Sequence, residues 1–213
     1  MILHRLWQSL QEHVFPLPST ALLFNVYRDR NPACDREDAA EVRRSNLRRY
    51  VASFSARPRV LLVGEAPGPW GARFSGIPFT SERQLCQDPD FPLDGRPSST
   101  AEPPHVSNSS KLFWGAVARH HPHFFVWNCV PLHPHQPGNA LSVRAPKRRE
   151  VRAYRGQLEA VVAALEPEDI AAIGRKAEGA LDDLGLACTY VRHPSQGGAR
   201  EFREGVEAFF LGR

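Results

Sequence analysis

Apolar and polar residues follow one another in a pattern that predicts short strands alternating with helices. Apolar runs rich in β-branched and aromatic residues stop abruptly at glycine, asparagine or a basic residue, which is typical of buried strands. They predict strands at residues 60–63, 124–127, 170–173 and 187–191. Stretches with apolar residues at helical spacing predict helices at residues 2–13, 35–54, 147–165, 175–184 and 201–211, and another from Ser109 or Ser110 to about Arg119.

This alternation predicts an α/β fold, because parallel strands joined by helices are covered on both faces. We expect a three-layer α/β/α architecture with a central, mostly parallel sheet of four strands. No internal repeat or linker is found, so the sequence predicts a single domain over residues 1–213, with residues 1–56 forming a helical extension packed on it. Residues 87–105 hold five prolines and are predicted to be irregular.

Composition narrows the class of protein. Hydrophobic residues make up 42% and charged residues 23%, as in ordinary soluble proteins. The first residues do not form a signal peptide, and no apolar run is long enough to cross a bilayer. We therefore expect a soluble, cytoplasmic monomer without a membrane partner. A net charge of +4 permits an acidic partner such as nucleic acid, although the preference for arginine over lysine is equally explained by genome composition.

Cysteine and histidine offer little support for a metal site. The four cysteines (Cys34, Cys86, Cys129 and Cys188) are widely scattered and contain no C-x-x-C pair, which argues against a cysteine metal site and a disulfide framework. Six histidines between residues 105 and 135 lack the spacing and the carboxylate partner typical of metal ligands. We expect no metal and no cofactor.

A glycine- and proline-rich stretch, GEAPGPWG at residues 64–71, follows the first predicted strand. Glycine and proline fix the path of such a loop and allow its main-chain N–H groups to approach a ligand. Gly64, Asn128, Gly174 and His193 each lie just beyond the end of a predicted strand. Ligands of open parallel sheets bind at the carboxyl ends of the strands. The sequence therefore predicts the functional site at this edge.

Three ordered motifs resemble the uracil-DNA glycosylase superfamily, most closely its single-strand-selective monofunctional members. Residues 64–79, GEAPGPWGARFSGIPF, match the family form G-x-N-P-G-P-F-G-x-x-x-T-G-x-P-F without a gap. Residues 125–132, FVWNCVPL, are similar to F-V-x-N-x-C-P-L, and residues 193–195 match the family's H-P-S. Residues 173–178, IGRKAE, are similar to a connecting strand and helix of the family. The resemblance covers roughly residues 58–210.

The resemblance implies a pocket that reads a flipped base. Phe79 would stack on the base, while the Asn128 amide would pair with uracil N3–H and O4. His193 would donate a hydrogen bond toward O2, where negative charge builds as the glycosidic bond breaks. Gly64 and Ala66 would line the same pocket. For each side chain a structural alternative stays open: a core phenylalanine, an asparagine that caps a strand end, and a structural histidine.

One position departs from the closest relatives. Ala66 stands where the single-strand-selective enzymes have an asparagine that helps to hold the attacking water. The stretch GEAPG instead resembles the first motif of the iron–sulfur uracil-DNA glycosylases, in which the glutamate serves the water. This chain lacks their cysteine cluster. We assign the water-positioning role to Glu65 as a hypothesis, with an ion pair to a nearby arginine as the alternative.

The resemblance also implies contacts to the DNA backbone. Candidates with backbone N–H groups or small or basic side chains are Gly68, Ser195, Gln196, Gly197, Gly198 and Arg200. Relatives push a wedge into the duplex from the last of these loops, but residues 196–200 contain no bulky apolar side chain. The basic run Arg144, Lys147, Arg148, Arg149 and Arg152 is better explained as a solvated helix end than as a DNA contact.

These observations predict a monofunctional DNA glycosylase that hydrolyses the N-glycosidic bond of uracil, or of a related deaminated base, in single- or double-stranded DNA, the first step of base excision repair. Two alternatives remain. One is a catalytically weak or inactive protein that binds DNA or a damaged base on the same fold, suggested by Ala66. The other is an N-glycoside hydrolase of free nucleotides.

Overall fold

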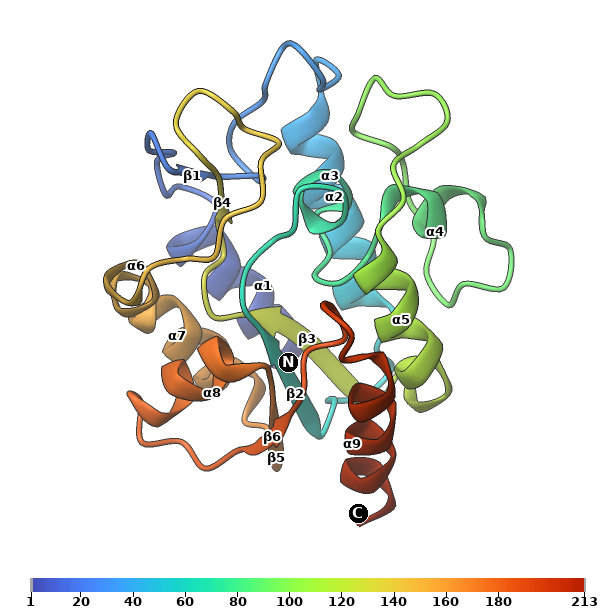
Figure 1. Cartoon of the computed structure of the whole chain (residues 1–213), viewed down its shortest axis with the longest axis vertical. Coiled ribbons are helices and arrows are strands. Elements are labelled where there is room, and N and C mark those ends of the chain that lie inside the picture. The colour runs from blue at the N-terminus through green and yellow to red at the C-terminus, as the bar shows by residue number, and fades with distance from the viewer. Residues whose placement is uncertain (1, 213) are drawn as a thin grey trace.

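A parallel sheet of four strands forms the centre of the protein. The structure, a computed structural model, describes residues 2–212 (Figure 1). The sheet consists of β2 (Val60–Gly64), β3 (Phe124–Asn128), β5 (Asp169–Ile173) and β6 (Thr189–Val191), in the order β3-β2-β5-β6. All neighbouring strands are parallel. The predicted α/β architecture is therefore confirmed.

The two strands that carry the motifs are buried along their whole length. Every residue of β2 and β3 is buried, which explains why both read as continuous apolar runs rather than as alternating patterns. Their register pairs Val60 with Phe124 and Gly64 with Asn128. The last residues of the two strands consequently lie side by side at the carboxyl edge.

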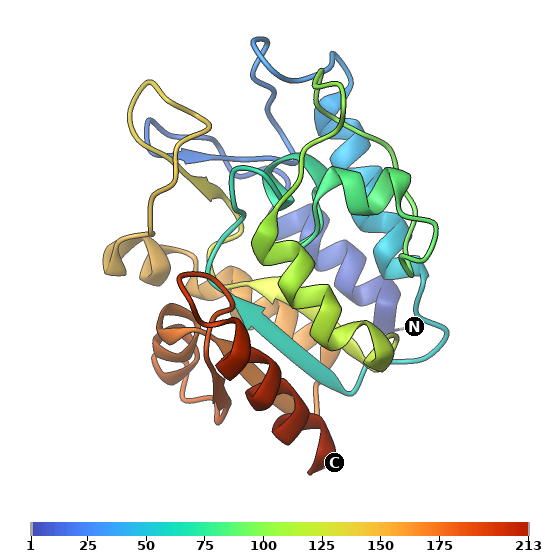
Figure 2. The same cartoon turned by 45° about the vertical axis from the view of Figure 1, so that its right-hand side comes forward.

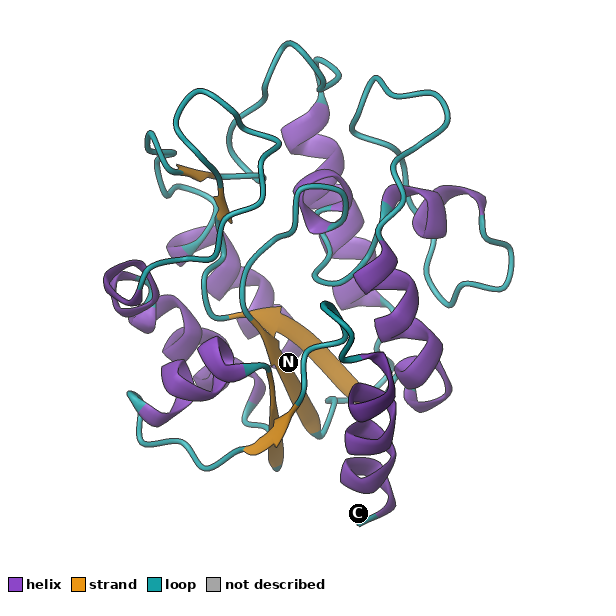
Figure 3. Ribbon diagram, in the orientation of Figure 1, coloured by secondary structure: helices purple, strands orange, loops and turns teal. Residues whose placement is uncertain are grey.

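Helices cover both sides of the sheet (Figure 3). On one side lie α5 (Asn108–Val117) and α9 (Ala199–Leu211), which contact each other. On the other side lie α7 (Arg155–Leu165) and α8 (Arg175–Asp182), with α1 (Ile2–His13) packed against α7 (Figures 1 and 2). The short 3-10 helix η1 (Ala118–His120) follows α5.

Short strands and further helices complete the part of the chain that the structure describes. The strands β1 (Leu23–Phe24) and β4 (His133–Pro134) form an antiparallel pair. The remaining helices are α2 (Ala39–Ala52), α3 (Ala72–Ser75), α4 (Glu82–Gln87) and α6 (Arg148–Ala153). Among residues 2–212, no helix combines the length and apolar character needed to cross a bilayer.

Several element boundaries differ from the sequence prediction. The helix expected at residues 147–165 is interrupted at Tyr154, which leaves helical geometry and separates α6 from α7. The helix expected from residue 35 begins at Ala39 instead, because Asp35 is part of a buried ion-pair cluster.

The basic run at the start of α6 is not solvated throughout, contrary to the sequence prediction. Arg144 forms a nearly buried, bidentate pair with Glu150.

Candidate active site

Gly64 lies at the centre of the carboxyl edge, between two residues that the sequence analysis assigned to a base pocket. A Cβ atom at this position would lie 2.4 Å from Cε2 of Phe79 and 2.7 Å from Oδ1 of Asn128. Any side chain would therefore displace one of the two. Glycine at position 64 lets the Phe79 ring and the Asn128 amide approach the same point from different elements.

Phe79 is held in an unusual conformation at the end of the loop that follows α3. Its φ angle is 52°, in the left-handed region that residues other than glycine seldom adopt. The ring stacks on Phe113 of α5, with centroids 4.4 Å apart and planes at 14°. The side chain is only partly buried, and its centroid lies 5.6 Å from the His193 ring.

Asn128 presents an amide without a partner at the end of β3. The residue is 4% exposed, and its side chain forms no hydrogen bond with any of residues 2–212. The amide oxygen and nitrogen are not completely buried, so water or a ligand can reach them. An amide kept in this state has donor and acceptor groups available for a ligand.

The hydrogen bonds of His193 determine which ring nitrogen carries the proton. The backbone N–H of Ser195 donates to Nδ1 at 3.2 Å, and Oγ of Ser195 lies 2.8 Å from the same atom. In the neutral ring the proton is therefore on Nε2. Burial, with a smaller contribution from Arg192, lowers the pKa of His193 to about 4. The ring is neutral at pH 7 and its Nε2–H is available as a donor.

Gly174 supports His193 from β5. A Cβ atom at Gly174 would lie 3.3 Å from Cβ of His193, and the Gly174 N–H donates to the carbonyl of Val191. The φ angle of Gly174 is 94°, which favours glycine here. The end of β5 thus fixes the chain that carries the histidine.

Glu65 follows Gly64 and continues the pairing of β2 with β3. Its carbonyl accepts hydrogen bonds from the Val130 N–H and the Cys129 thiol. Burial raises the pKa of its carboxyl group, an effect that nearby Lys176 partly offsets. No arginine among residues 2–212 forms an ion pair with Glu65, so its neighbouring cation is a lysine of α8 rather than the arginine considered from the sequence.

The remaining predicted site residues lie in the flanking loops. Ala66 is half-buried and packs against the core, so no polar side chain is available at the position of the family's asparagine. Gly68 is exposed in the turn after β2. Gln196 and Gly197 have φ angles of 53° and 80°, and a Cβ at Gly198 would lie 2.3 Å from the His193 carbonyl.

Arg200 is the second residue of α9 and is not part of the loop itself. It is exposed on α9 and lies 4.0 Å from Glu204, one helical turn further on. Arg192 contacts the loop instead, where its guanidinium donates to the carbonyls of His193 and Gln196. The loop before α9 lies beside the carboxyl end of β2 (Figures 1 and 2).

Sequence reasoning missed the supporting residues of the site. They are Phe113 behind Phe79, Lys176 near Glu65, and Arg192 across the loop. Only Lys176 could have been predicted from the sequence, since it is the second residue of the helix that follows Gly174 and therefore lies at the carboxyl edge. Partners such as Phe113 depend on how helices pack, which the motifs do not encode.

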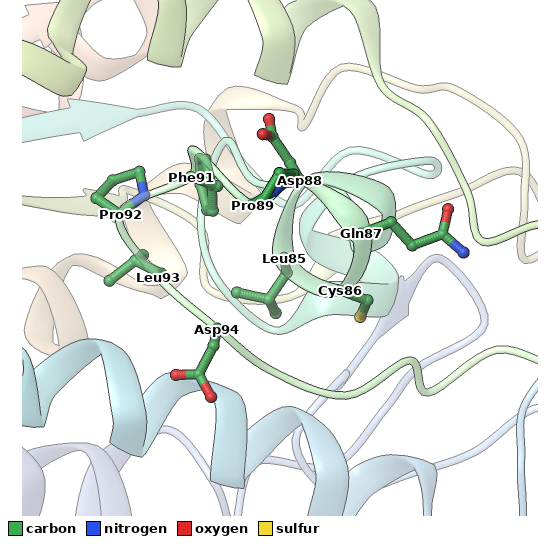
Figure 4. Close-up of a pocket in the computed structure, with 9 residues that line it drawn as sticks. All are labelled: Leu85, Cys86, Gln87, Asp88, Pro89, Phe91, Pro92, Leu93 and Asp94. Atoms are coloured by element: carbon green, nitrogen blue, oxygen red, sulfur yellow. The ribbon is translucent and has the colours of Figure 1, made fainter.

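A separate open hollow of about 590 Å³ lies away from these residues. Figure 4 shows that it is formed by α4 and the chain that follows, residues 85–94, and includes none of the motif side chains. Among residues 2–212, no three histidine, cysteine, aspartate or glutamate side chains lie close enough together to hold a metal ion.

The geometry defines an α/β protein that presents an aromatic ring, an unpaired amide and a neutral histidine at the carboxyl edge of a parallel sheet. The sequence model of the uracil DNA glycosylase superfamily matches residues 51–209. The chain belongs to this superfamily. Membership supports a DNA glycosylase-type function in DNA repair, with DNA as the partner.

A solved structure shares the fold. Wild-type SMUG2 from Pedobacter heparinus superposes with a TM-score of 0.66 at 16% sequence identity, over 99% of this chain and 97% of that chain. At this identity the likeness concerns the fold. A search among curated proteins found no significant match.

Proposed function

We propose that this protein hydrolyses the N-glycosidic bond of uracil, or of a related deaminated base, in DNA. The observation that carries the proposal is the convergence of Phe79, the unpaired Asn128 amide and the Nε2–H of His193 around the end of β2. Each of the three offers a different interaction to a flat ring with polar edges. Superfamily membership supports the same reaction class.

Base recognition is assigned to Phe79 and Asn128. Phe113 backs one face of Phe79, which leaves the ring a rigid surface against which a flipped base can stack. Uracil offers an N3–H donor beside an O4 acceptor, which the amide oxygen and NH₂ group of Asn128 can match. Cytosine offers the reverse pattern, so an amide fixed in one orientation discriminates against it.

Bond cleavage is assigned to His193 and Glu65. As the C–N bond breaks, its electron pair moves into the base, and charge collects on O2. A neutral His193 held by Ser195 donates Nε2–H to that oxygen without needing to reorganise. The Glu65 carboxylate positions the water that attacks the sugar carbon and accepts its proton. The hydroxyl of the water stays on the sugar and leaves an abasic site, while the base anion takes up a proton from solvent and Glu65 releases the one it accepted. The free base is the second product, and no metal or cofactor takes part.

The test uses labelled oligonucleotides that contain one uracil, either single-stranded or opposite guanine or adenine. After incubation and alkali treatment, strand breakage reports the abasic product. We expect breakage by the wild type, and rates lowered about 10²–10³-fold in His193→Ala and Asn128→Ala. His4→Ala, a change at an exposed histidine of α1, serves as the matched control and should retain the wild-type rate.

Other outcomes would decide against the proposal. Binding of the oligonucleotide without breakage would favour the inactive DNA-binding protein that Ala66 suggests. Hydrolysis of deoxyuridine monophosphate in the absence of any action on DNA would favour a nucleotide hydrolase. Unchanged rates in both the His193 and the Asn128 variants would show that these residues do not form the active site, whatever the substrate.

A further inference from the structure

Trp70 is exposed at the carboxyl edge and is not used in the proposed mechanism. Its side chain is 42% exposed, whereas Trp114 and Trp127 are almost completely buried. It lies in the turn between β2 and α3, where the Gly71 N–H donates to the Gly68 carbonyl. An exposed tryptophan in a tight turn beside a candidate active site is a candidate contact for a ligand.

A column of aromatic rings and one guanidinium group connects Trp70 to the interior, beginning with a tilted contact between Trp70 and His105. The Trp70 and His105 centroids are 5.3 Å apart, and those of His105 and Phe74 are 4.2 Å apart. The buried Arg73 guanidinium lies 4.8 Å from the Phe74 ring and 4.1 Å from the Phe24 ring. Trp70 is therefore the exposed end of a column in which His105 is half-buried and Phe74, Arg73 and Phe24 are buried.

The column is anchored at its inner end. Both terminal nitrogens of Arg73 donate to the Asp35 carboxylate, at 3.1 and 2.9 Å. Burial and stacking limit the positions that the inner rings can adopt. Because its support is fixed, Trp70 can bind a flat ligand without losing much conformational entropy.

Trp70 is also close to the base pocket. A Cβ atom at Gly71, the next residue, would lie 3.4 Å from the carbonyl oxygen of Thr80, which follows Phe79. Trp70 is thus linked to Phe79 through the close approach of their chain neighbours, Gly71 and Thr80.

We propose that the exposed face of Trp70 stacks on an unpaired base adjacent to the flipped nucleotide. The ligand is single-stranded DNA, because the bases of an intact duplex are already stacked on both faces. This site would partly replace the wedge that residues 196–200 lack, by holding a neighbouring base out of the helix instead of filling the gap. The inference rests on the proposed function, since it places the flipped base at Phe79.

The test measures binding and does not depend on cleavage. The probe is a fluorescently labelled thymidine oligonucleotide with one abasic-site analogue, compared with a blunt duplex of the same sequence. Removal of one base–aromatic stack typically costs a factor of about 5–100 in affinity. We expect Trp70→Ala to lose that factor on the single strand and little on the duplex. Trp70→Phe should retain most of the affinity, and Leu211→Ala, at an exposed apolar residue of α9, all of it.

A second measurement uses the intrinsic fluorescence of the protein. Stacking on a base should quench the emission of Trp70, and the quenching should disappear in Trp70→Phe. The inference would be overturned if wild type and Trp70→Ala bound the single strand equally well, or if the variant lost as much affinity for the duplex as for the single strand. Unchanged quenching in Trp70→Phe, or no binding by the wild type, would overturn it as well. Uracil excision by the wild type is scored separately, so failure of the proposed function is recognised independently.

Discussion

Glu65 provides the residue-level test of the proposed chemistry, because burial acts against its charged form. Its pKa is raised above the ordinary value of 4.5, whereas that of His193 is lowered to about 4. The reactive state needs an ionised Glu65 and a neutral His193. As the pH falls, Glu65 gains its proton before His193 does, so activity should decline at a pH above 4.5 and the decline should report Glu65.

We expect Glu65→Gln to lower kcat by about 10²–10⁴ and to remove this acid limb from the pH–rate profile of uracil excision. Glu41→Gln, at an exposed glutamate of α2, should leave both unchanged. An acid limb that persists in Glu65→Gln would assign the titration to another group and the water to another residue.

Single residues also show how far the sequence could predict the site. The positions of Phe79, Asn128 and His193 followed from motifs matched in register, and their roles remain predictions. The tautomer of His193 could not be predicted, because it depends on a backbone N–H two residues away. The left-handed conformation of Phe79 could not be predicted either, since only glycine and a few polar residues commonly adopt such a φ angle.

At the scale of elements, β3 is an edge strand whose free side is covered by α2. The Val126 N–H donates to the hydroxyl of Tyr50 at 3.0 Å, and the Tyr50 ring stacks on Phe125. A single side chain thus satisfies a strand donor that would otherwise be buried without a partner.

Tyr50→Phe should lower the free energy of unfolding by about 1–3 kcal/mol, since the ring remains but the buried N–H loses its acceptor. Urea unfolding measures the change. Tyr154→Phe is the control, because the Tyr154 hydroxyl has no hydrogen-bond partner among residues 2–212, and it should cost much less. Equal losses in both variants would mean that the hydroxyl of Tyr50 contributes nothing through this bond.

Long periodic elements were predicted well, and short ones were not. The buried strands and the helices α1, α5 and α9 agree with the sequence pattern to within a few residues. The two-residue strands β1 and β4 carry no periodicity, because a partner distant in the chain creates them. The interruption falls at Tyr154 itself, not at a proline or glycine, so the sequence carries no clear local signal for it.

At the scale of the whole molecule, a buried ion-pair cluster ties the N-terminal part to the first motif. Asp35, Arg43 and Arg73 are almost completely buried, and Asp35 contacts both guanidinium groups. Burial alone would raise the pKa of Asp35, but the two arginines outweigh it and lower the pKa below the ordinary value. The charge on Asp35 is therefore needed in the folded state.

Asp35→Asn should lower the free energy of unfolding by about 3–5 kcal/mol at pH 7, because it leaves two buried guanidinium groups without their counter-ion. Asp94→Asn, which removes an exposed ion pair with Arg49, should cost less than about 1 kcal/mol. Denaturant unfolding of both variants measures the contrast. Similar small losses in both would show that the cluster is not held by charge.

The turn that leads to Phe79 is also bound from outside the span matched by the superfamily. Tyr27 donates to the Gly76 carbonyl at 2.7 Å, and the Asn46 amide donates to the Ser75 carbonyl at 2.9 Å. Both donors precede residue 51, where the match begins. A protein shortened to the matched span would retain every recognisable motif yet lose these anchors, so exchange of pockets between relatives would require the first 46 residues to be transplanted as well.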